Sequence, residues 1–497
     1  MEVLDTTIVN VSLPHIAGAV SASYDEATWT LTSYLVANGI VLPVSGWIGR
    51  VVGRKRYFLI CIGMFTVCSF LCGMATSLGE MVVFRLMQGF FGGGLQPNQQ
   101  SIILDTFPAE QRGRAFSVVA VAIIVAPIVG PTLGGWITDN YSWRWVFLIN
   151  VPVGVFTFAA IWRLVEDPPW VVREHLYGDK SVDYTGLGLI VIGLGSLEVM
   201  LDRGEDADWF SSPMIRLFGF LALAGILGAI GWLLYAKRPV VDLRVFADRN
   251  FAAGSIVIFA IGAILYSSAV LIPQLAQVQL GYTATLAGLL LSPGAVLMVL
   301  LIPIVGKMLL PSVQTRYIIA FGFFSLGCAL LYAHRLTPNP DFMTLATMRA
   351  AQTVGLAFLF VPASTISYST LPRELNADAA ALYTMLRNIG GSVGISLATA
   401  MVVQRTQVHR AFLANHLTPF NQNYQDLLAH TQDTLRSLGQ SASGAMGQIN
   451  QVLNAQAAIL AYLDVFALCA VAAFCVVPVA LLFRPSKAGD GAKPAGH

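Results

Sequence analysis

Charged residues are scarce in this sequence of 497 residues. Asp, Glu, Lys and Arg make up 11% of the chain, hydrophobic residues make up 56%, and the mean hydropathy is +0.68. An ordinary soluble domain carries about 25% charged residues. A chain of this composition lacks the polar surface of a soluble enzyme, so we expect an all-α integral membrane protein.

An excess of one charge sign is also missing. The 29 basic and 27 acidic residues nearly balance, which argues against binding of nucleic acid through a basic surface. The six cysteines all lie in apolar stretches, where we expect neither a disulfide framework nor a zinc site. No Walker A sequence occurs, so ATP is not the evident energy source. The sequence therefore predicts no metal and no organic cofactor.

Apolar runs long enough to cross a bilayer recur along the whole chain. A transmembrane helix needs about 20 predominantly apolar residues. Such runs lie at residues 29–49, 57–76, 81–106, 115–138, 144–164, 184–201, 213–236, 251–273, 284–306, 317–334, 342–370, 378–403 and 459–483. A partial run at residues 3–20 opens the chain and is interrupted by Asp5, Asn10 and Pro14. We expect fourteen spans, the first truncated at its N-terminus because the chain begins inside that helix.

The basic residues between these runs indicate the orientation of the chain. Nineteen of the 29 Lys and Arg residues lie in connections on one side, seven lie on the other, and Arg85, Arg349 and Arg387 lie within spans. Cytoplasmic loops carry the excess of Lys and Arg. We therefore place both the N- and the C-terminus in the cytoplasm.

The spans group as six, two and six. We expect an N-terminal six-helix bundle at residues 1–165, a cytoplasmic connection at 166–183, inserted helices at 184–236, a second cytoplasmic connection at 237–250, a C-terminal six-helix bundle at 251–484 and a disordered tail at 485–497. Two six-helix halves are a common transporter plan, with the substrate near the midplane between them.

One long polar loop, residues 404–458, interrupts the C-terminal bundle on the outer, periplasmic side. Apolar residues recur in it every three or four positions from Leu413 to Leu453, which predicts amphipathic helices. Two interpretations remain open. The loop is either a helical hairpin packed on the protein's own outer surface or a docking surface for a periplasmic partner.

Charged residues inside spans are costly and mark functional candidates. Asp5 lies near Thr6, Thr7 and Asn10, and a carboxylate that gains and loses a proton between two access states suits proton coupling. The alternative is a carboxylate held by a structural arginine. Arg85 cannot lose its proton, so it is either a fixed charge that tunes a nearby carboxylate or a structural ion-pair partner.

Polar residues on several spans are candidates for a substrate cavity. They are Asn10, Gln88, Gln96, Asn98, Gln352, Arg387 and Asn388. Spacing alone does not decide whether Arg349, Gln352, Arg387, Asn388 and Glu198 line a cavity or form structural pairs.

The span at residues 115–138 has the composition of a hinge. It contains Pro127, Gly130, Pro131, Gly134 and Gly135. Proline kinks a helix and glycine permits close helix contact. An inert, tightly packed kink is the alternative.

Four segments, taken in order, resemble signatures of a known family. They are LDTTIVNVSLP at 4–14, GWIGRVVGRKR at 46–56, FRLMQGFFGGG at 84–94 and APIVGPTLGGW at 126–136. The sequence resembles the fourteen-helix drug:proton antiporters of the major facilitator superfamily, the EmrB/QacA type. Further matches at residues 200–212, 239–251 and 281–289 extend the similarity over nearly the whole chain.

This resemblance implies a major facilitator fold with two six-helix bundles and two inserted helices. It implies a transporter and not an enzyme, namely a multidrug efflux antiporter of a bacterial inner membrane that exports hydrophobic toxic compounds by alternating access, with the proton gradient as energy source. It also implies a periplasmic adaptor of the EmrA type and an outer-membrane channel of the TolC type.

Export of a fatty acid, a siderophore or another metabolite is an alternative on the same fold. A membrane scaffold or sensor that transports nothing is a further alternative, which the polar residues inside the spans argue against.

The resemblance also carries over to particular residues. Asp5 and Arg85 match the first-helix acid and the fourth-helix arginine of the family, both implicated in proton coupling. The matched antiporter signature comprises Gly130, Pro131, Gly134 and Gly135, and the matched cytoplasmic loop motif comprises Gly46, Gly53, Arg54 and Lys55. The loop motif of the wider superfamily has Asp where this chain has Arg50. A gate that depends on the ion pair of that Asp is therefore in question here, although pumps of this type share a basic residue at the position.

Overall fold

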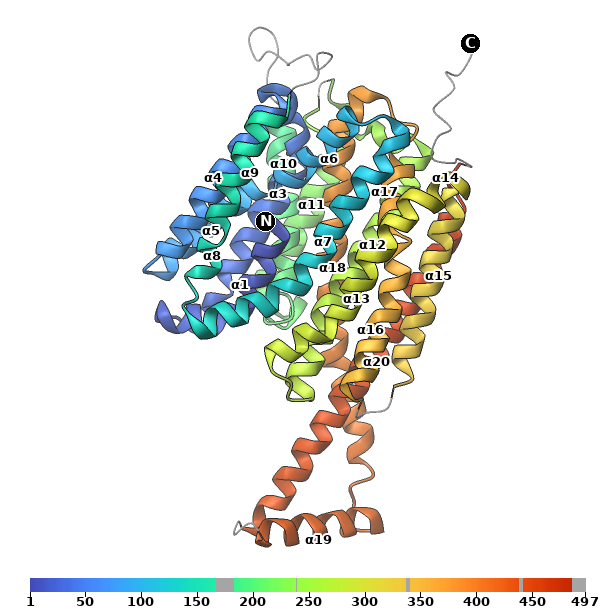
Figure 1. Cartoon of the computed structure of the whole chain (residues 1–497). Helices are drawn as coiled ribbons and strands as arrows, with labels where there is room; N and C mark the ends of the chain where they lie inside the picture. Colours follow the sequence, from blue (N-terminus) through green and yellow to red (C-terminus); the bar gives the residue numbers. More distant parts are fainter. Residues whose placement is uncertain (167–182, 238, 337–339, 438–440, 485–497) are drawn as a thin grey trace.

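Long helices lie side by side in a bundle, and one helical extension projects from it (Figure 1). The computed structural model describes residues 1–166, 183–237, 239–336, 340–437 and 441–484. Within these ranges the regular structure is helical, with no β-strand. The predicted disordered tail, residues 485–497, lies outside the described residues, as does most of the connection at 166–183.

The N-terminal half contains six spans. Its helices are α1 (Glu2–Ala19), α2 (Tyr24–Ala27), α3 (Trp29–Val52), α4 (Arg54–Met74), α5 (Leu78–Gly92), α6 (Leu95–Thr106), α7 (Ala109–Asn140), α8 (Trp145–Leu148) and α9 (Asn150–Leu164). The predicted span at 81–106 is divided into α5 and α6, which break at Gly93 and Gly94. A Cβ atom at Gly93 would lie 2.7 Å from the Asn38 carbonyl oxygen, so the break brings α3 unusually close.

The inserted pair and the C-terminal half follow. The inserted helices are α10 (Tyr184–Arg203) and α11 (Pro213–Tyr235), and the C-terminal half comprises α12 (Arg249–Gln274), α13 (Ala284–Ile304), α14 (Leu310–Ser312), α15 (Thr315–His334), α16 (Phe342–Ala357), α17 (Phe360–Ser367), α18 (Asn376–Ala414), α19 (Gln422–Ser437) and α20 (Ala445–Ala480). α10 packs against α3 and α18, and α11 packs against α10. The inserted pair therefore touches the bundle through α10.

The described helices account for the fourteen predicted spans. Eleven segments are long and apolar enough to cross a membrane. α1, the α5–α6 pair and α7 supply the other three. α1 has 18 residues and begins at mid-depth in the bundle (Figure 1).

Two helices are longer than predicted. α18 continues to Ala414, beyond the expected end at residue 403, and α20 begins at Ala445 instead of residue 459. Both extend past the bundle to α19, which lies at the far tip (Figure 1). The polar loop predicted at 404–458 is thus largely helical, and it projects away from the bundle instead of lying on its surface.

The two six-helix halves use the same helix pairings. In the N-terminal half α3 packs on α5, α4 packs on α5 and α9, and α1 packs on α7. In the C-terminal half α13 packs on α16, α15 packs on α16 and α20, and α12 packs on α18. Contacts between the halves match as well, because α3 meets α18 and α7 meets α13. This correspondence is that of two repeats around a central axis, as in many transporters.

Candidate functional site

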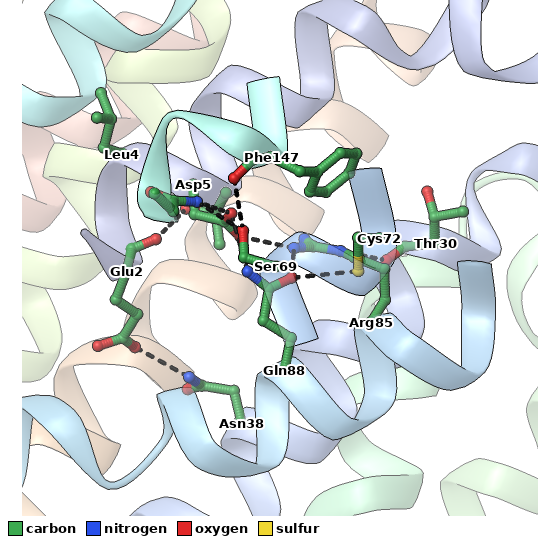
Figure 2. Close-up of polar contacts among 12 residues, drawn as sticks. Glu2, Leu4, Asp5, Thr30, Asn38, Ser69, Cys72, Arg85, Gln88 and Phe147 are labelled. Carbon is green, nitrogen blue, oxygen red and sulfur yellow. Dashed lines mark hydrogen bonds and ion pairs between the residues drawn. The ribbon is translucent and has the colours of Figure 1, made fainter. Parts of the chain in front are cut away.

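Asp5 and Arg85 form an ion pair in the interior of the N-terminal half (Figure 2). Arg85 Nη1 of α5 lies 2.6 Å from Asp5 Oδ2 of α1, and both side chains have 0% relative exposure. Gln88, one turn after Arg85, donates to Asp5 Oδ1 over 3.1 Å. The sequence singled out these three residues, and the structure brings them together.

Further groups hold Arg85 in place. Its Nε donates to the Thr30 carbonyl oxygen over 3.2 Å, and its Nη1 also donates to Gln88 Oε1 over 2.8 Å. The guanidinium carbon lies 4.2 Å from the centre of the Tyr34 ring. A buried cation is stable only when it is paired and hydrogen-bonded. These contacts satisfy Arg85 at Nε and Nη1, whereas its Nη2 has no hydrogen-bond partner.

Asn150 completes the surroundings of Asp5 and was not predicted. This first residue of α9 donates to Asp5 Oδ1 over 2.7 Å and to Ser69 Oγ over 3.1 Å. Ser69 in turn donates to the Phe147 carbonyl oxygen over 2.9 Å. The Asp5 carboxylate thus accepts three side-chain N–H donors. An Asn inside an apolar run was the available sequence signal.

A second buried carboxylate, Glu2, lies one helical turn before Asp5. Asn38 of α3 donates to Glu2 Oε1 over 2.9 Å (Figure 2), whereas Glu2 Oε2 has no hydrogen-bond partner. Glu2 is 7% exposed. The sequence does not single out Glu2, because it lies at the very start of a first span that the sequence predicts to be truncated.

A cavity of about 360 Å³ lies between the two halves. Helices α1, α3, α5, α6, α10, α12 and α18 contribute to its wall. Among its lining residues are Glu2, Thr6, Asn10, Tyr34, Asn38, Arg85, Gln96, Glu198, Asp202, Tyr266, Asn388 and Ser392. Drug-sized ligand sites have volumes of about 300–1,000 Å³, so the cavity volume lies within the range for a small-molecule ligand.

Three of the predicted cavity residues, Asn10, Gln96 and Asn388, line this cavity. The others lie elsewhere in this structure. Gln88 belongs to the Asp5 network, and Asn98 donates to the Arg54 carbonyl oxygen over 2.9 Å. Gln352 and Arg387 are buried, with 0% and 1% exposure, outside the cavity wall.

Arg387 of α18 connects the halves through neutral partners. Its Nη2 donates to Gln96 Oε1 of α6 and, over 3.1 Å, to Asn388 Oδ1. Within the described ranges, no carboxylate forms an ion pair with it. Arg387 thus brings a positive charge to the interface between the halves, where the Glu2 carboxylate interacts with it electrostatically.

The inserted helix α10 supplies two carboxylates to the cavity. Ser392 of α18 donates to Glu198 Oε2 over 3.0 Å. Thr32 of α3 donates to Asp202 Oδ2. Glu198, which the sequence left unassigned, therefore lies in the cavity wall, and α10 hydrogen-bonds both halves.

The glycines of the antiporter signature bring α7 against α1. A Cβ atom at Gly130 would overlap the Thr7 side chain, and one at Gly134 would lie 3.0 Å from the Ile8 carbonyl oxygen. α7 is one continuous helix over this segment, which also contains Pro127, Pro131 and Gly135. The signature thus fixes the helix that carries Asp5, and its hinge role stays a prediction.

The cytoplasmic loop motif lies where the two halves meet. Arg50 Nη1 is 2.6 Å from Asp378 Oδ2 of α18, and a Cβ atom at Gly46 would lie 2.8 Å from the Ala377 carbonyl oxygen. Arg54 pairs with Asp105 of α6.

Gly53, between α3 and α4, has φ 95°, a conformation that favours glycine. It lets the chain reverse direction directly before Arg54 and Lys55, the first two residues of α4. The turn therefore positions the basic residues of the motif at the end of the bundle.

Comparisons with known proteins agree with this architecture. The family model described as Major Facilitator Superfamily matches residues 1–395. The chain is 38% identical over 467 residues to "Multidrug export protein EmrB" of Escherichia coli (strain K12), covering 94% of this chain and 89% of that protein. It is 34% identical over 486 residues to "Fatty acid resistance protein FarB" of Neisseria gonorrhoeae, covering 98% and 94%.

A solved structure shares the fold at low sequence identity. The crystal structure of an auto-inhibited POT family peptide transporter matches with a TM-score of 0.58 and 16% identity, covering 98% of this chain and 96% of that one. The family match and the relatives above cover most of the chain. The chain therefore belongs to the Major Facilitator Superfamily and is a membrane transporter, not an enzyme.

Proposed function

We propose that this chain is a proton-driven multidrug exporter of a bacterial inner membrane, with both termini in the cytoplasm. The observation that carries the proposal is the buried Asp5–Arg85 pair, with its atoms 2.6 Å apart, beside a cavity between the halves. The 38% identity to a multidrug export protein supports the substrate range. The excess of basic residues in the cytoplasmic connections supports the orientation.

Asp5 is the proton carrier in this proposal. Its ionised form fits the three N–H donors that surround it. Protonation removes the negative charge that Arg85 faces, and leaving one member of a buried ion pair uncompensated costs about 3–5 kcal/mol. The protonated state therefore favours a different packing of α1 against α5, and α1 also lines the cavity.

Alternating access requires that the two ends of the seam between the halves open in turn. In the structure described here the Arg50–Asp378 ion pair joins the halves, and the proposed orientation puts this pair at the cytoplasmic end. Opening toward the cytoplasm breaks this pair, and drug release toward the outside keeps it. In this proposal the transporter alternates between a state in which Asp5 is protonated and a state in which the Arg50–Asp378 pair is formed.

The helical extension is the proposed docking surface for a tripartite pump. It comprises the ends of α18 and α20 beyond the bundle, together with α19 (Figure 1). Large apolar side chains are exposed on it, including Phe412, Phe420 and Met446, with exposures of 64%, 98% and 64%. Exposed apolar clusters mark interaction sites. We propose a periplasmic adaptor of the EmrA type as its partner, which connects to an outer-membrane channel of the TolC type.

Reconstitution tests the coupling role. Proteoliposomes with an imposed proton gradient are loaded with a panel of fluorescent hydrophobic drugs, and drug movement is followed over time. We expect Asp5→Asn to abolish proton-driven movement, whereas Asp433→Asn, which removes an exposed carboxylate on α19, retains it. Full activity of Asp5→Asn would reject the proposal that Asp5 couples transport to protons.

Export of a fatty acid or another metabolite on the same fold is the second candidate. The 34% identity to a fatty acid resistance protein over 98% of this chain favours it. Growth of a knockout strain against a panel of drugs, fatty acids and siderophores separates the two. Sensitivity to fatty acids alone would favour this candidate over multidrug export.

A further inference from the structure

The sequence around Arg85 is repeated in the C-terminal half. The segment FRLMQ at 84–88 and the segment MRAAQ at 348–352 share an Arg and a Gln three residues apart. Each pair is followed by a helix break, at Gly93–Gly94 after α5 and at Phe358–Leu359 after α16. The two halves use the same pairings, so α16 is the counterpart of α5.

The two Arg–Gln pairs also share their local geometry. Arg85 Nη1 donates to Gln88 Oε1 over 2.8 Å. Arg349 Nη1 donates to Gln352 Oε1 over 3.4 Å. Arg349 is 3% exposed and Gln352 is 0% exposed. The C-terminal half therefore holds a second buried guanidinium beside a second buried amide.

The two pairs differ in what they bind. In the N-terminal half Arg85 Nε donates to the Thr30 carbonyl oxygen and Gln88 Nε2 donates to Asp5. The corresponding atoms of the C-terminal half, Arg349 Nε and Gln352 Nε2, have no hydrogen-bond partner.

No carboxylate in the described part of the chain forms an ion pair with Arg349. α12, the counterpart of the helix that carries Asp5, contains no Asp or Glu. The C-terminal half thus repeats the Arg and Gln donors of the N-terminal half but has no counterpart of the Asp5 carboxylate.

We propose that Arg349 and Gln352 bind the carboxylate of a lipophilic organic acid, in the position that Asp5 occupies in the other half. This inference rests on the proposed export function and names one class of its substrates. A guanidinium and an amide N–H form a donor set that suits a carboxylate. Arg85 lines the central cavity, whereas Arg349 and Gln352 lie outside its wall, so the proposal requires the anion to reach them as the two halves rearrange.

The energetics favour a ligand role over a structural one. A buried charge without a partner destabilises a protein, and a charged residue inside a membrane-spanning helix is by default a candidate for a functional role. Arg85 Nη2 also lacks an acceptor, but Arg85 has the Asp5 carboxylate as its ion-pair partner. Arg349 lacks an acceptor at Nε and forms no ion pair with a carboxylate of the described residues, so a bound anion would supply the missing negative charge.

Equilibrium binding of three pyrene probes tests the proposal. The protein in lipid nanodiscs is titrated with 1-pyrenebutanoate, the neutral 1-pyrenebutanol and the cationic 1-pyrenebutyltrimethylammonium, without a proton gradient. We expect Arg349→Gln to weaken binding of the carboxylate at least tenfold and to leave the affinity for the alcohol unchanged. Arg349→Lys keeps the charge but loses the Nε donor, and we expect an intermediate loss. Arg244→Gln is the matched control, because the Arg244 side chain is 78% exposed.

Thermal unfolding without ligand provides a second readout. We expect Arg349→Gln to raise the Tm, because it removes an uncompensated charge, whereas Arg85→Gln lowers the Tm. Unchanged carboxylate affinity in Arg349→Gln, equal losses for acid and alcohol, or a lowered Tm would overturn the proposal. Failure of proton-driven transport in the wild-type protein would instead reject the proposed function and leave the binding result standing.

Discussion

Arg50 of α3 and Asp378 of α18 form an ion pair of 2.6 Å between residues that are 328 positions apart in the sequence. It joins the two halves at the end that the proposed orientation puts in the cytoplasm. The wider superfamily is expected to have Asp at the position of Arg50. In this chain the basic residue at that position faces a carboxylate on the opposite half, so an ion pair is present although the expected acid is absent.

Charge reversal tests whether this pair stabilises the state that is closed to the cytoplasm. We expect Arg50→Asp and Asp378→Arg each to shift the equilibrium toward the cytoplasm-open state by about 1–3 kcal/mol, or roughly 5- to 150-fold. The double variant restores opposite charges and recovers most of the shift. Accessibility of an engineered cysteine in the cavity to a membrane-impermeant maleimide, applied from each side, measures the equilibrium. A double variant as impaired as the single variants would contradict the role of the pair.

Removal of Arg85 alone destabilises the protein, because it leaves Asp5 buried without its cation. We expect Arg85→Gln to cost about 3–5 kcal/mol. Asp5→Asn combined with Arg85→Gln removes both charges of the pair and recovers much of this loss. Thermal unfolding of the purified protein in detergent compares the variants. An additive loss in the double variant would show that the two side chains do not depend on each other.

Close packing of α1 on α7 depends on Gly134. A Cβ atom there would lie 3.0 Å from the Ile8 carbonyl oxygen, and overpacking of this kind costs about 1–3 kcal/mol. We expect Gly134→Ala to lower both the Tm and the transport rate. Gly18→Ala, at a glycine of α1 with no atom within 4 Å of the added carbon, is the matched control and retains both. Normal transport by Gly134→Ala would remove the argument that this contact positions Asp5.

The helical extension is expected to matter in cells and not for drug binding. Deletion of residues 411–455 should abolish resistance of the host while the purified protein still binds drug. Phe412→Ser combined with Phe420→Ser is a milder variant, and Gln448→Ser, at an exposed polar residue of α20, is its control. Loss of both resistance and drug binding would indicate a folding role for the extension.

Hydropathy and the cost of buried charge made much of the fold predictable. The spans, and Asp5, Arg85 and Gln88 as residues of interest, followed from the scarcity of polar groups in apolar runs. The partners of these residues did not. Asn150 reaches Asp5 from a helix 145 positions away, and no sequence spacing encodes such a contact.

The extents of α18 and α20 were underestimated for a different physical reason. An apolar run ends where polar residues begin, whereas helix propensity continues through Gln, Arg and Ala. Residues 404–414 of α18 are rich in such residues. Composition therefore marks where a helix leaves the membrane but not where the helix ends.

The inserted helix α10 makes the two flanks of the transporter unequal. It packs against both α3 and α18, which meet where the halves join on one side. Lipid tails are kept from the seam on that flank, whereas α7 and α13 form the seam on the other. The seam formed by α7 and α13 is therefore the flank that the inserted helices leave uncovered.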